Sequence, residues 1–138
     1  MEDQGGVVAV DELDLIEGLF GAARTGKMQE VGQILHRRPW LVHARDAYDT
    51  TALREACLNG HREIVTYLLD KGANVNQQVE GISLLQDALR VDDMALFNLL
   101  LKRGADPHLD RYSCLDRAKA EGHSECIKLL EVSSQSTT

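Results

Sequence analysis

One motif recurs along this chain at intervals of about 33 residues, and this period constrains the fold more than any other feature of the sequence. Residues 53–63 follow the pattern L-x-x-A-x-x-x-G-H-x-E, and residues 115–125 repeat it without a gap. Looser copies begin at Leu19 and Leu85, so the leading leucines are 30 to 34 residues apart. A fixed period of this length is typical of an array in which each repeat is one supersecondary unit.

Each copy has the apolar spacing of two short helices. In the second copy Leu53, Ala56 and Cys57 fall at i, i+3 and i+4, and residues 64–69 give a wider apolar stripe. Helices this short are marginal alone and must bury their apolar faces on a neighbour. Because aromatic residues make up only 4% of the chain, the core must be aliphatic. The sequence therefore predicts an all-α solenoid of four stacked helix–turn–helix units.

The domain boundaries follow from the phase of the motif. We expect the repeat domain to span residues 11–132, with flexible segments at residues 1–10 and 133–138, where the periodicity is absent. The expected repeats are 11–45, 46–78, 79–109 and 110–132.

Glycines mark the turns between the paired helices. Gly26, Gly60 and Gly122 stand where the chain reverses, a place that favours a left-handed backbone. The third repeat has Asp92 there, which can adopt this backbone at some cost, so we expect its turn to be the loosest. Ser83 followed three residues later by a glutamine has the form of a capping box and predicts a helix start.

Together these residues resemble the ankyrin-repeat family, whose repeat is commonly written T-P-L-H-x-A, then G-H, an apolar helix and G-A-D-V-N. Residues 51–76 follow that pattern closely, residues 83–108 are a weaker copy, and the resemblance covers about residues 13–132. The histidine of T-P-L-H is absent from every repeat, so we expect the loop-bracing hydrogen bonds that it supplies in the family to be weaker here. Its replacements are Phe20, Arg54, Gln86 and Asp116.

The resemblance implies a module that binds another protein and is not an enzyme. We expect an adaptor or a regulatory or inhibitory subunit, monomeric on its own, that needs no cofactor or metal. The resemblance also implies short β-hairpin-like fingers, and the chain would hold a partner segment in the concave groove that fingertips and first helices form in the family. From His108 to Leu115 the chain is three residues shorter than from His43 to Leu53, so the last finger should be truncated. The groove positions carried over are Arg24, Arg45, Tyr48, Thr50, Leu58, Asn59, Glu80, Ile82, Arg90, Val91, Asp110 and Tyr112.

Asn76 is a candidate modification site by the same resemblance. It lies eight residues after Leu68 in a Val-Asn hairpin, the arrangement in which ankyrin proteins are substrates of an asparaginyl hydroxylase. The structural alternative is that the Asn76 side chain braces its turn, as asparagine side chains commonly do.

Three other functions stay open: a thiol enzyme, a metal-dependent enzyme, and a structural piece of a larger assembly. Cys57 and His61 are four residues apart, as a nucleophile and its base could be, but Gly60 breaks the helix between them. The zinc-type ligands in the last part of the chain lack the close pair spacing of structural zinc sites. These ligands are His108, Cys114, His123 and Cys126.

The charge distribution limits the classes of partner. The net charge is −7, and residues 1–20 carry six acidic and no basic side chains, which weighs against duplex nucleic acid as the main partner. No apolar run reaches the roughly 18–20 residues of a membrane span. Three cysteines without paired spacing favour a reducing location in the cytoplasm or nucleus. A group of arginines could attract an acidic peptide, and its members are Arg24, Arg37, Arg38, Arg45, Arg54 and Arg62.

Overall fold

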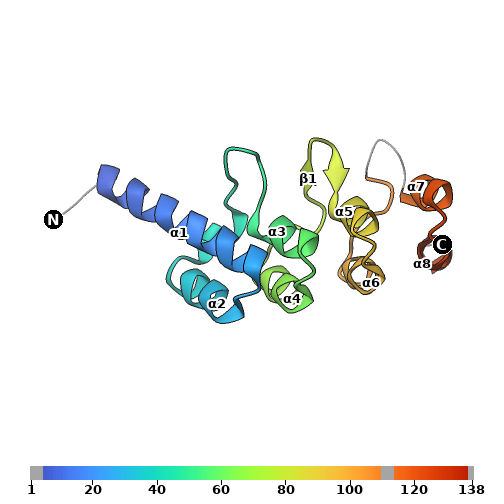
Figure 1. The fold of residues 1–138 in the computed structure, drawn as a ribbon, viewed down its shortest axis with the longest axis horizontal. Coiled ribbons are helices and arrows are strands. Elements are labelled where there is room, and N and C mark those ends of the chain that lie inside the picture. The colour runs from blue at the N-terminus through green and yellow to red at the C-terminus, as the bar shows by residue number, and fades with distance from the viewer. Residues whose placement is uncertain (1–4, 110–113, 137–138) are drawn as a thin grey trace. The chain divides into compact units, whose positions relative to one another are not determined.

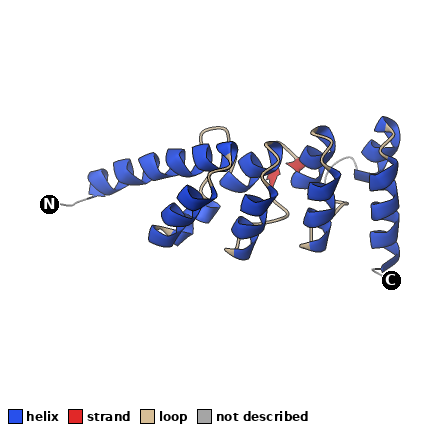
Figure 2. Ribbon diagram, turned by 60° about the horizontal axis from the view of Figure 1, so that its bottom comes forward, coloured by secondary structure: helices blue, strands red, loops and turns tan. Residues whose placement is uncertain are grey.

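The computed structural model describes residues 5–109 and 114–136, and the side chains of residues 12–109 and 116–131. The chain divides into two compact units, residues 1–73 and residues 74–138. Each unit contains two helix–turn–helix pairs, which confirms the paired helices that the sequence predicted (Figure 1). Strands form one short hairpin in the described part of the chain (Figure 2).

Unit 1 consists of two helix pairs joined by a loop. Its elements are α1 (Gly5–Thr25), α2 (Met28–Arg37), a 3₁₀ turn η1 (Pro39–His43), α3 (Ala52–Leu58) and α4 (Arg62–Asp70). Helix α1 packs on α3 and helix α2 packs on α4, so unit 1 has two helical layers (Figure 1). The loop of residues 44–51 projects away from these layers between the two pairs (Figure 1).

The core of unit 1 is largely aliphatic, as the low aromatic content predicted. The leading leucines and the apolar residues that follow them are almost fully buried; they include Leu19, Val31, Leu53, Ala56, Cys57, Ile64, Val65 and Leu68. Burying one leucine or isoleucine side chain contributes about 1.5–3 kcal/mol. This burial stabilises helices such as the seven-residue α3, which are too short to persist alone.

The turn between α1 and α2 explains the recurring Gly and His of the motif. Gly26 adopts a φ of +83°, in the left-handed region that favours glycine. His61, which precedes α4, places its Nε2 atom 3.0 Å from the carbonyl oxygen of Arg24 in that turn. A Cβ atom on Gly26 would lie only 2.7 Å from the His61 ring. The glycine therefore serves both the backbone conformation and the close approach of the histidine.

Unit 2 begins with the hairpin and continues with two helix pairs. Its elements are β1 (Gln78–Val79), β2 (Ile82–Ser83), α5 (Leu84–Arg90), α6 (Met94–Lys102), α7 (Cys114–Glu121) and α8 (Ser124–Ser136). Helix α5 packs on α7 and helix α6 on α8. The buried side chains of this unit include Leu84, Leu85, Ala88, Leu89, Leu96, Phe97, Leu100, Ala118, Cys126 and Leu130.

A two-residue turn closes the hairpin. Gln78 pairs with Ser83 and Val79 with Ile82 in antiparallel register, which leaves Glu80 and Gly81 at the tip. Both tip residues have positive φ, 54° and 79°, as the primed turns of short hairpins require. Ser83 then caps α5, because its hydroxyl oxygen accepts a hydrogen bond from the backbone N–H of Gln86. The helix start that the capping-box pattern predicted is thus confirmed.

Asp92 occupies the turn between α5 and α6 in the left-handed conformation predicted for it, with a φ of 59°. Its carboxylate lies 3.6 Å from Nδ1 of His123, whose Nε2 is 3.1 Å from a carboxylate oxygen of Glu121. The second Gly-His motif therefore has a carboxylate of the preceding turn as its partner, where His61 has a backbone carbonyl.

The ends of the chain differ from the prediction. Helix α1 begins at Gly5, inside the segment 1–10 that we predicted to be flexible, and α8 continues to Ser136, inside the segment 133–138. Both helices therefore extend past residues 11 and 132, and these boundaries stay a prediction for the repeat domain. A helix propagates more easily than it starts, so α1 and α8 extend past the last residues with repeat periodicity. The predicted truncation of the last finger falls on residues 110–113, which lie outside the described part.

Candidate functional site

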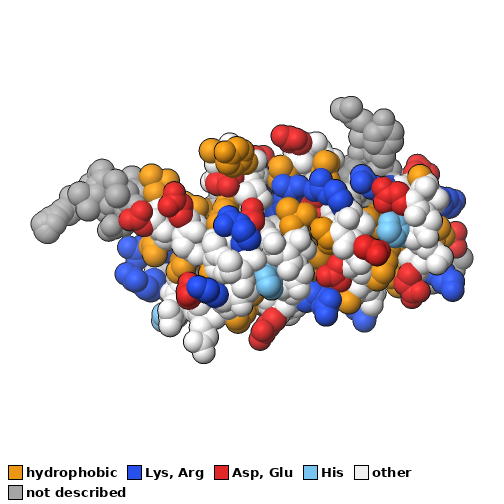
Figure 3. Space-filling model, viewed as in Figure 1, with side chains coloured by type: hydrophobic (Ala, Val, Ile, Leu, Met, Phe, Trp, Pro, Cys, Tyr) orange, Lys and Arg blue, Asp and Glu red, His pale blue; other side chains and the backbone are white. Residues whose placement is uncertain are grey.

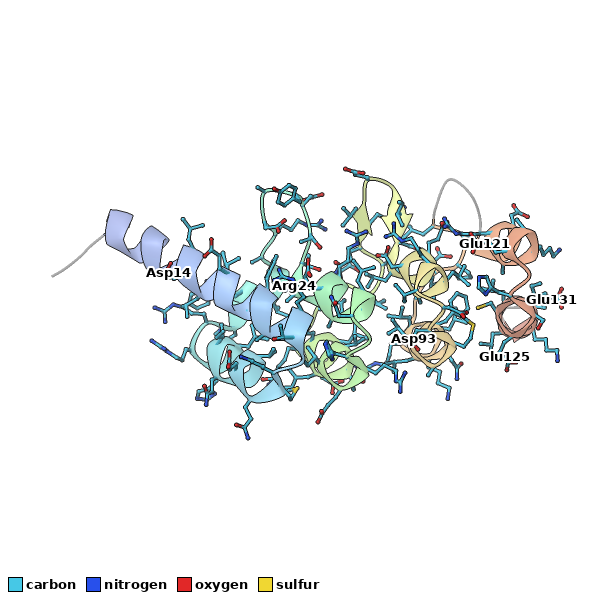
Figure 4. All side chains as sticks on the ribbon, viewed as in Figure 1. Asp14, Arg24, Asp93, Glu121, Glu125 and Glu131 are labelled. Atoms are coloured by element: carbon cyan, nitrogen blue, oxygen red, sulfur yellow. The ribbon has the colours of Figure 1, made fainter. Side chains whose placement is uncertain are left out.

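Unit 1 has a groove between helix α1 and the loop of residues 44–51. The groove encloses about 530 Å³, and we call it the α1 groove. One wall comes from α1 and the other from the projecting loop, and Arg24 marks the α1 wall in Figure 4. The lining residues are Leu13, Ile16, Glu17, Phe20, Arg24, Arg45, Asp46, Ala47 and Tyr48.

The α1 wall is an apolar stripe that becomes more exposed toward the start of the helix. Leu13, Ile16 and Phe20 stand at i, i+3 and i+7, so they share one face. Phe20 is buried, Ile16 is half-buried, and Leu13 is 60% exposed. The groove therefore deepens along the helix and leaves a large aliphatic side chain uncovered at its outer end.

The opposite wall is a loop whose own hydrogen bonds hold its shape. The Asp46 carboxylate accepts hydrogen bonds from the backbone N–H groups of Tyr48 and Thr50, at 2.9 and 3.1 Å. The backbone N–H of Asp46 donates to the Thr50 carbonyl, and that of Asp49 donates to the Asp46 carbonyl. Arg45 also donates to the Asp49 carbonyl at 2.9 Å. Tyr48 is 83% exposed on this braced loop, so a partner that binds it would have to order the tyrosine side chain but little of the loop backbone.

Most charges around the α1 groove are already neutralised. Arg24 forms an ion pair with Glu55 of α3 at 3.1 Å, and Arg45 forms one with Asp49 at 3.2 Å. Glu17 is exposed on the α1 wall and makes no hydrogen bond or ion pair within the described structure. One uncompensated carboxylate thus stands beside the apolar stripe.

The arginines that we grouped as a possible basic patch are occupied in several local interactions. Two of them form the ion pairs just described. Arg38 lies over the ring of Trp40, with its guanidinium 5.8 Å from the ring centroid, and the indole N–H donates to Glu12. These contacts reduce the attraction that the group would exert on an acidic peptide.

The groove residues predicted for unit 1 fall in different places. Arg24, Arg45 and Tyr48 line the α1 groove, whereas Leu58 is half-buried outside it and Asn59 donates to the Glu55 carbonyl of its own helix. Thr50, also predicted as a groove position, is buried, with only 5% of the residue exposed. The bonds to Asp46 turn this threonine inward, and its hydroxyl oxygen has no hydrogen-bond partner in the described structure.

Sequence reasoning missed most of the α1 wall. Leu13, Ile16, Glu17 and Phe20 were absent from the predicted contact set, because the acidic stretch of residues 11–17 resembled an ordinary helix start and Phe20 replaces a histidine of the repeat motif. The available signal was the helical spacing of Leu13, Ile16 and Phe20, which continues the apolar stripe of the first repeat toward the start of the helix.

The positions predicted for unit 2 lie on the hairpin and around the end of α5. Glu80 is exposed at the hairpin tip, Ile82 is half-buried in β2, and Val91 is 39% exposed after α5. Arg90 is exposed and pairs at 2.8 Å with the fully buried carboxylate of Asp87, so its charge has a structural partner. Asp110 and Tyr112 lie outside the described residues.

Asn76 connects two loops that are far apart in the sequence. Its Oδ1 accepts a 2.7 Å hydrogen bond from the backbone N–H of Asp106, and its Nδ2 is 3.4 Å from the Gly104 carbonyl oxygen. The Asn76 side chain therefore bridges to the loop after α6 and does not brace its own turn as the structural alternative expected; within that turn the Asn74 carboxamide oxygen accepts a hydrogen bond from the Asn76 N–H. Hydroxylation of Asn76 stays a prediction.

The residues of the chemical alternatives are buried or engaged. Cys57 is fully buried, and His61 approaches the Arg24 carbonyl. Burial, and then the carboxylates of Asp92 and Glu125, raise the pKa of the Cys126 thiol from 9.0 to about 11. The side chains of 12–109 and 116–131 form no group of three or more His, Cys, Asp or Glu residues suited to a metal ion, and Cys114 lies outside them.

None of the helices, within the residues described, is both long enough and apolar enough to cross a bilayer.

Comparison with known protein families identifies the repeats of this chain. A model of the family described as ankyrin repeats, in three copies, matches residues 16–79.

Several curated proteins are similar to this chain over part of their length. BCL-6 corepressor-like protein 1 of Homo sapiens is 41% identical over 93 residues, which is 67% of this chain and 5% of that protein. The probable E3 ubiquitin-protein ligase XBOS32 of Oryza sativa is 30% identical over 120 residues, 83% of this chain and 24% of the ligase. Ankyrin repeat domain-containing protein SAT10 of Stachybotrys chartarum is 32% identical over 136 residues, 93% of this chain and 7% of SAT10.

This chain thus spans less than a quarter of the length of each of these relatives. The helix pairs with left-handed turns, the Gly-His contact to the preceding turn and the match over residues 16–79 agree with one another. The chain belongs to the ankyrin-repeat family, whose repeats are general protein-interaction modules.

Proposed function

We propose that this chain is a non-catalytic adaptor or regulatory module that holds a segment of a partner protein in the α1 groove. The observation that carries the proposal is an exposed tyrosine on a braced loop facing an uncovered apolar stripe on a helix. An aromatic side chain in a pre-shaped site is the kind of residue that dominates binding energy at interfaces.

The size of the groove fits a small set of anchoring side chains. A volume of about 530 Å³ lies within the range of roughly 300–1,000 Å³ of ligand-binding clefts. Covering Leu13 and Tyr48, both mostly exposed, would supply most of the affinity, at about 1–2 kcal/mol or more for each side chain. The rest of the contact would exclude water from these anchors.

The remaining parts of the proposal follow from charge and burial. The chain is proposed to act without catalysis, because its described cysteines are buried free thiols. Such thiols also favour a reducing intracellular location. The net negative charge makes nucleic acid an unfavourable partner, and a monomer is proposed for the isolated chain.

The test compares variants of the groove with a matched variant outside it. Tyr48→Ala and Leu13→Asp remove the two anchors, whereas Trp40→Ala removes a large side chain that is 55% exposed but does not line the groove. Proteins are captured from cell extract, and each captured protein is then purified and titrated against every variant. Circular dichroism and thermal melting establish that all variants are folded.

We expect a direct partner whose affinity falls at least tenfold with Tyr48→Ala and with Leu13→Asp but stays within twofold with Trp40→Ala. A set of partners that bind all variants equally would refute the α1 groove as the contact site.

A further inference from the structure

We infer that the partner segment is an amphipathic helix that carries a lysine or arginine three or four residues from its apolar anchor, with Glu17 as the partner of that cation. The inference rests on the proposed function and specifies the chemistry of the occupant. Two observations carry it. One is which charges of the α1 groove are already paired, and the other is which backbone N–H groups of the loop are already hydrogen-bonded.

Glu17 is the charged lining residue left without a counterpart. The other three are engaged: Arg24 with Glu55, Arg45 with Asp49, and Asp46 with two backbone N–H groups. Glu17 makes no hydrogen bond or ion pair within the described structure and is exposed. A carboxylate in this state attracts a cation and repels an anion, so the groove discriminates between segments by the sign of their charge.

The surroundings of Glu17 strengthen this preference. In the described part of α1, Glu12 and Asp14 add two acidic side chains before Glu17, and the basic side chain of this helix, Arg24, is paired with Glu55. Figure 3 shows acidic and hydrophobic side chains side by side along the part of α1 that this view exposes. The combination fits a segment that is apolar and basic, and it disfavours the acidic peptide that the arginine content alone indicated.

The loop wall does not offer an edge for strand addition. The backbone N–H groups of Asp46, Tyr48, Asp49 and Thr50 all donate to acceptors inside the loop. An added strand needs a row of unpaired N–H and C=O groups. A partner must therefore bind through its side chains, as a helix does when it places its apolar face in a groove.

The spacing on α1 sets the spacing on the partner. Leu13 and Glu17 are one helical turn apart, and residues at i and i+4 have Cβ atoms about 5–6 Å apart. A helix that packs beside α1 reaches both sites from two of its own residues that are also one turn apart. An anchor such as leucine or phenylalanine, followed or preceded at three or four positions by lysine or arginine, satisfies this geometry.

The experiment selects peptides from a phage-displayed library of random 16-residue sequences on the immobilised full chain. Four baits are used in parallel: the wild type, Glu17→Lys, Asp14→Lys and Leu13→Asp. Asp14→Lys is the matched control, because Asp14 is exposed on the same helix but lines a different hollow, with Leu15, Arg37 and Arg38 (Figure 4). Both charge reversals leave the net charge equal.

We expect the wild type and Asp14→Lys to enrich peptides with the apolar–basic pair, and Glu17→Lys to enrich peptides with an acidic residue in the basic position. A peptide selected on the wild type should bind Glu17→Lys about tenfold more weakly, because an attraction becomes a repulsion, and the difference should shrink in high salt. Leu13→Asp should abolish its binding.

Two results would overturn the inference. Peptides that require Leu13 but bind Glu17→Lys as well as they bind the wild type would refute the basic partner and leave the proposed function standing. Peptides that are indifferent to Leu13→Asp and to Tyr48→Ala, or an absence of any peptide that depends on Leu13, would count against the α1 groove itself.

Discussion

Replacing Asn76 tests whether one side chain ties two successive loops of unit 2 together. In Asn76→Ala both bridging hydrogen bonds are lost, the 2.7 Å bond from the Asp106 N–H and the 3.4 Å bond to the Gly104 carbonyl. A protein hydrogen bond contributes about 0.5–1.5 kcal/mol net, and the longer bond belongs at the low end of that range. Because Asp106 is exposed and water can replace its partner, we expect a total loss of about 1–2 kcal/mol.

The assays are urea unfolding and hydrogen exchange of individual amides. The free energy of unfolding should fall by this amount, and the Asp106 amide should exchange about tenfold faster for each 1.4 kcal/mol lost locally. Asn76→Asp keeps the acceptor of the short bond but removes the donor, so it should retain most of the protection. Asn59→Ala is the control, because the Asn59 side chain bonds only within its own helix. If Asn76→Ala is no less stable than Asn59→Ala and exchange at Asp106 is unchanged, the bridge has no energetic role.

Three further predictions address the fold, and they concern a pair of glycines, a pair of threonines and one cysteine. Gly26→Ala should cost about 2 kcal/mol or more in thermal unfolding, since it combines a positive φ with a contact to the imidazole ring; Gly72→Ala, with positive φ and open space, should cost only about 1 kcal/mol. Thr50→Val should be neutral or stabilising by up to about 1 kcal/mol because the buried hydroxyl has no partner, whereas Thr51→Val removes a helix cap and should cost about 1 kcal/mol. Cys126, with a pKa of about 11 against 9.0, should be alkylated at pH 8 at least a hundredfold more slowly in the native chain than in urea, as peptide mass mapping can measure. Since the folded thiol keeps its proton where the unfolded thiol loses it, stability present below pH 9.0 should fall between about pH 9 and 11; a flat profile would contradict the shift.

The repeat architecture could be predicted because it depends on contacts that recur with the sequence period. Leu53 and Ile64 are buried as their spacing indicated, and the glycines of the turns have positive φ. The left-handed backbone of Asp92 could be predicted for the same reason, because an aspartate can adopt the conformation of the glycine that it replaces. Local periodicity and backbone chemistry are enough for these features.

The candidate site was less predictable because it depends on residues that do not recur. The α1 wall uses Leu13 and Ile16, which precede the first copy of the motif and have no equivalent in later repeats. The inward turn of Thr50 follows from hydrogen bonds to Asp46 that no periodicity reveals. The bridge from Asn76 ends thirty residues away, at a backbone group whose position only the folded chain defines.

The contact between His61 and the first turn also bears on how unit 1 can come apart. The turn after α1 is contacted by His61 of the second repeat. The His61 ring packs against Gly26 of that turn only when the second repeat is folded. Loss of α4 would leave the Arg24 carbonyl without this partner and the apolar faces of both pairs open to water. The smallest cooperative block of unit 1 is therefore two repeats, and deleting either one should melt the other.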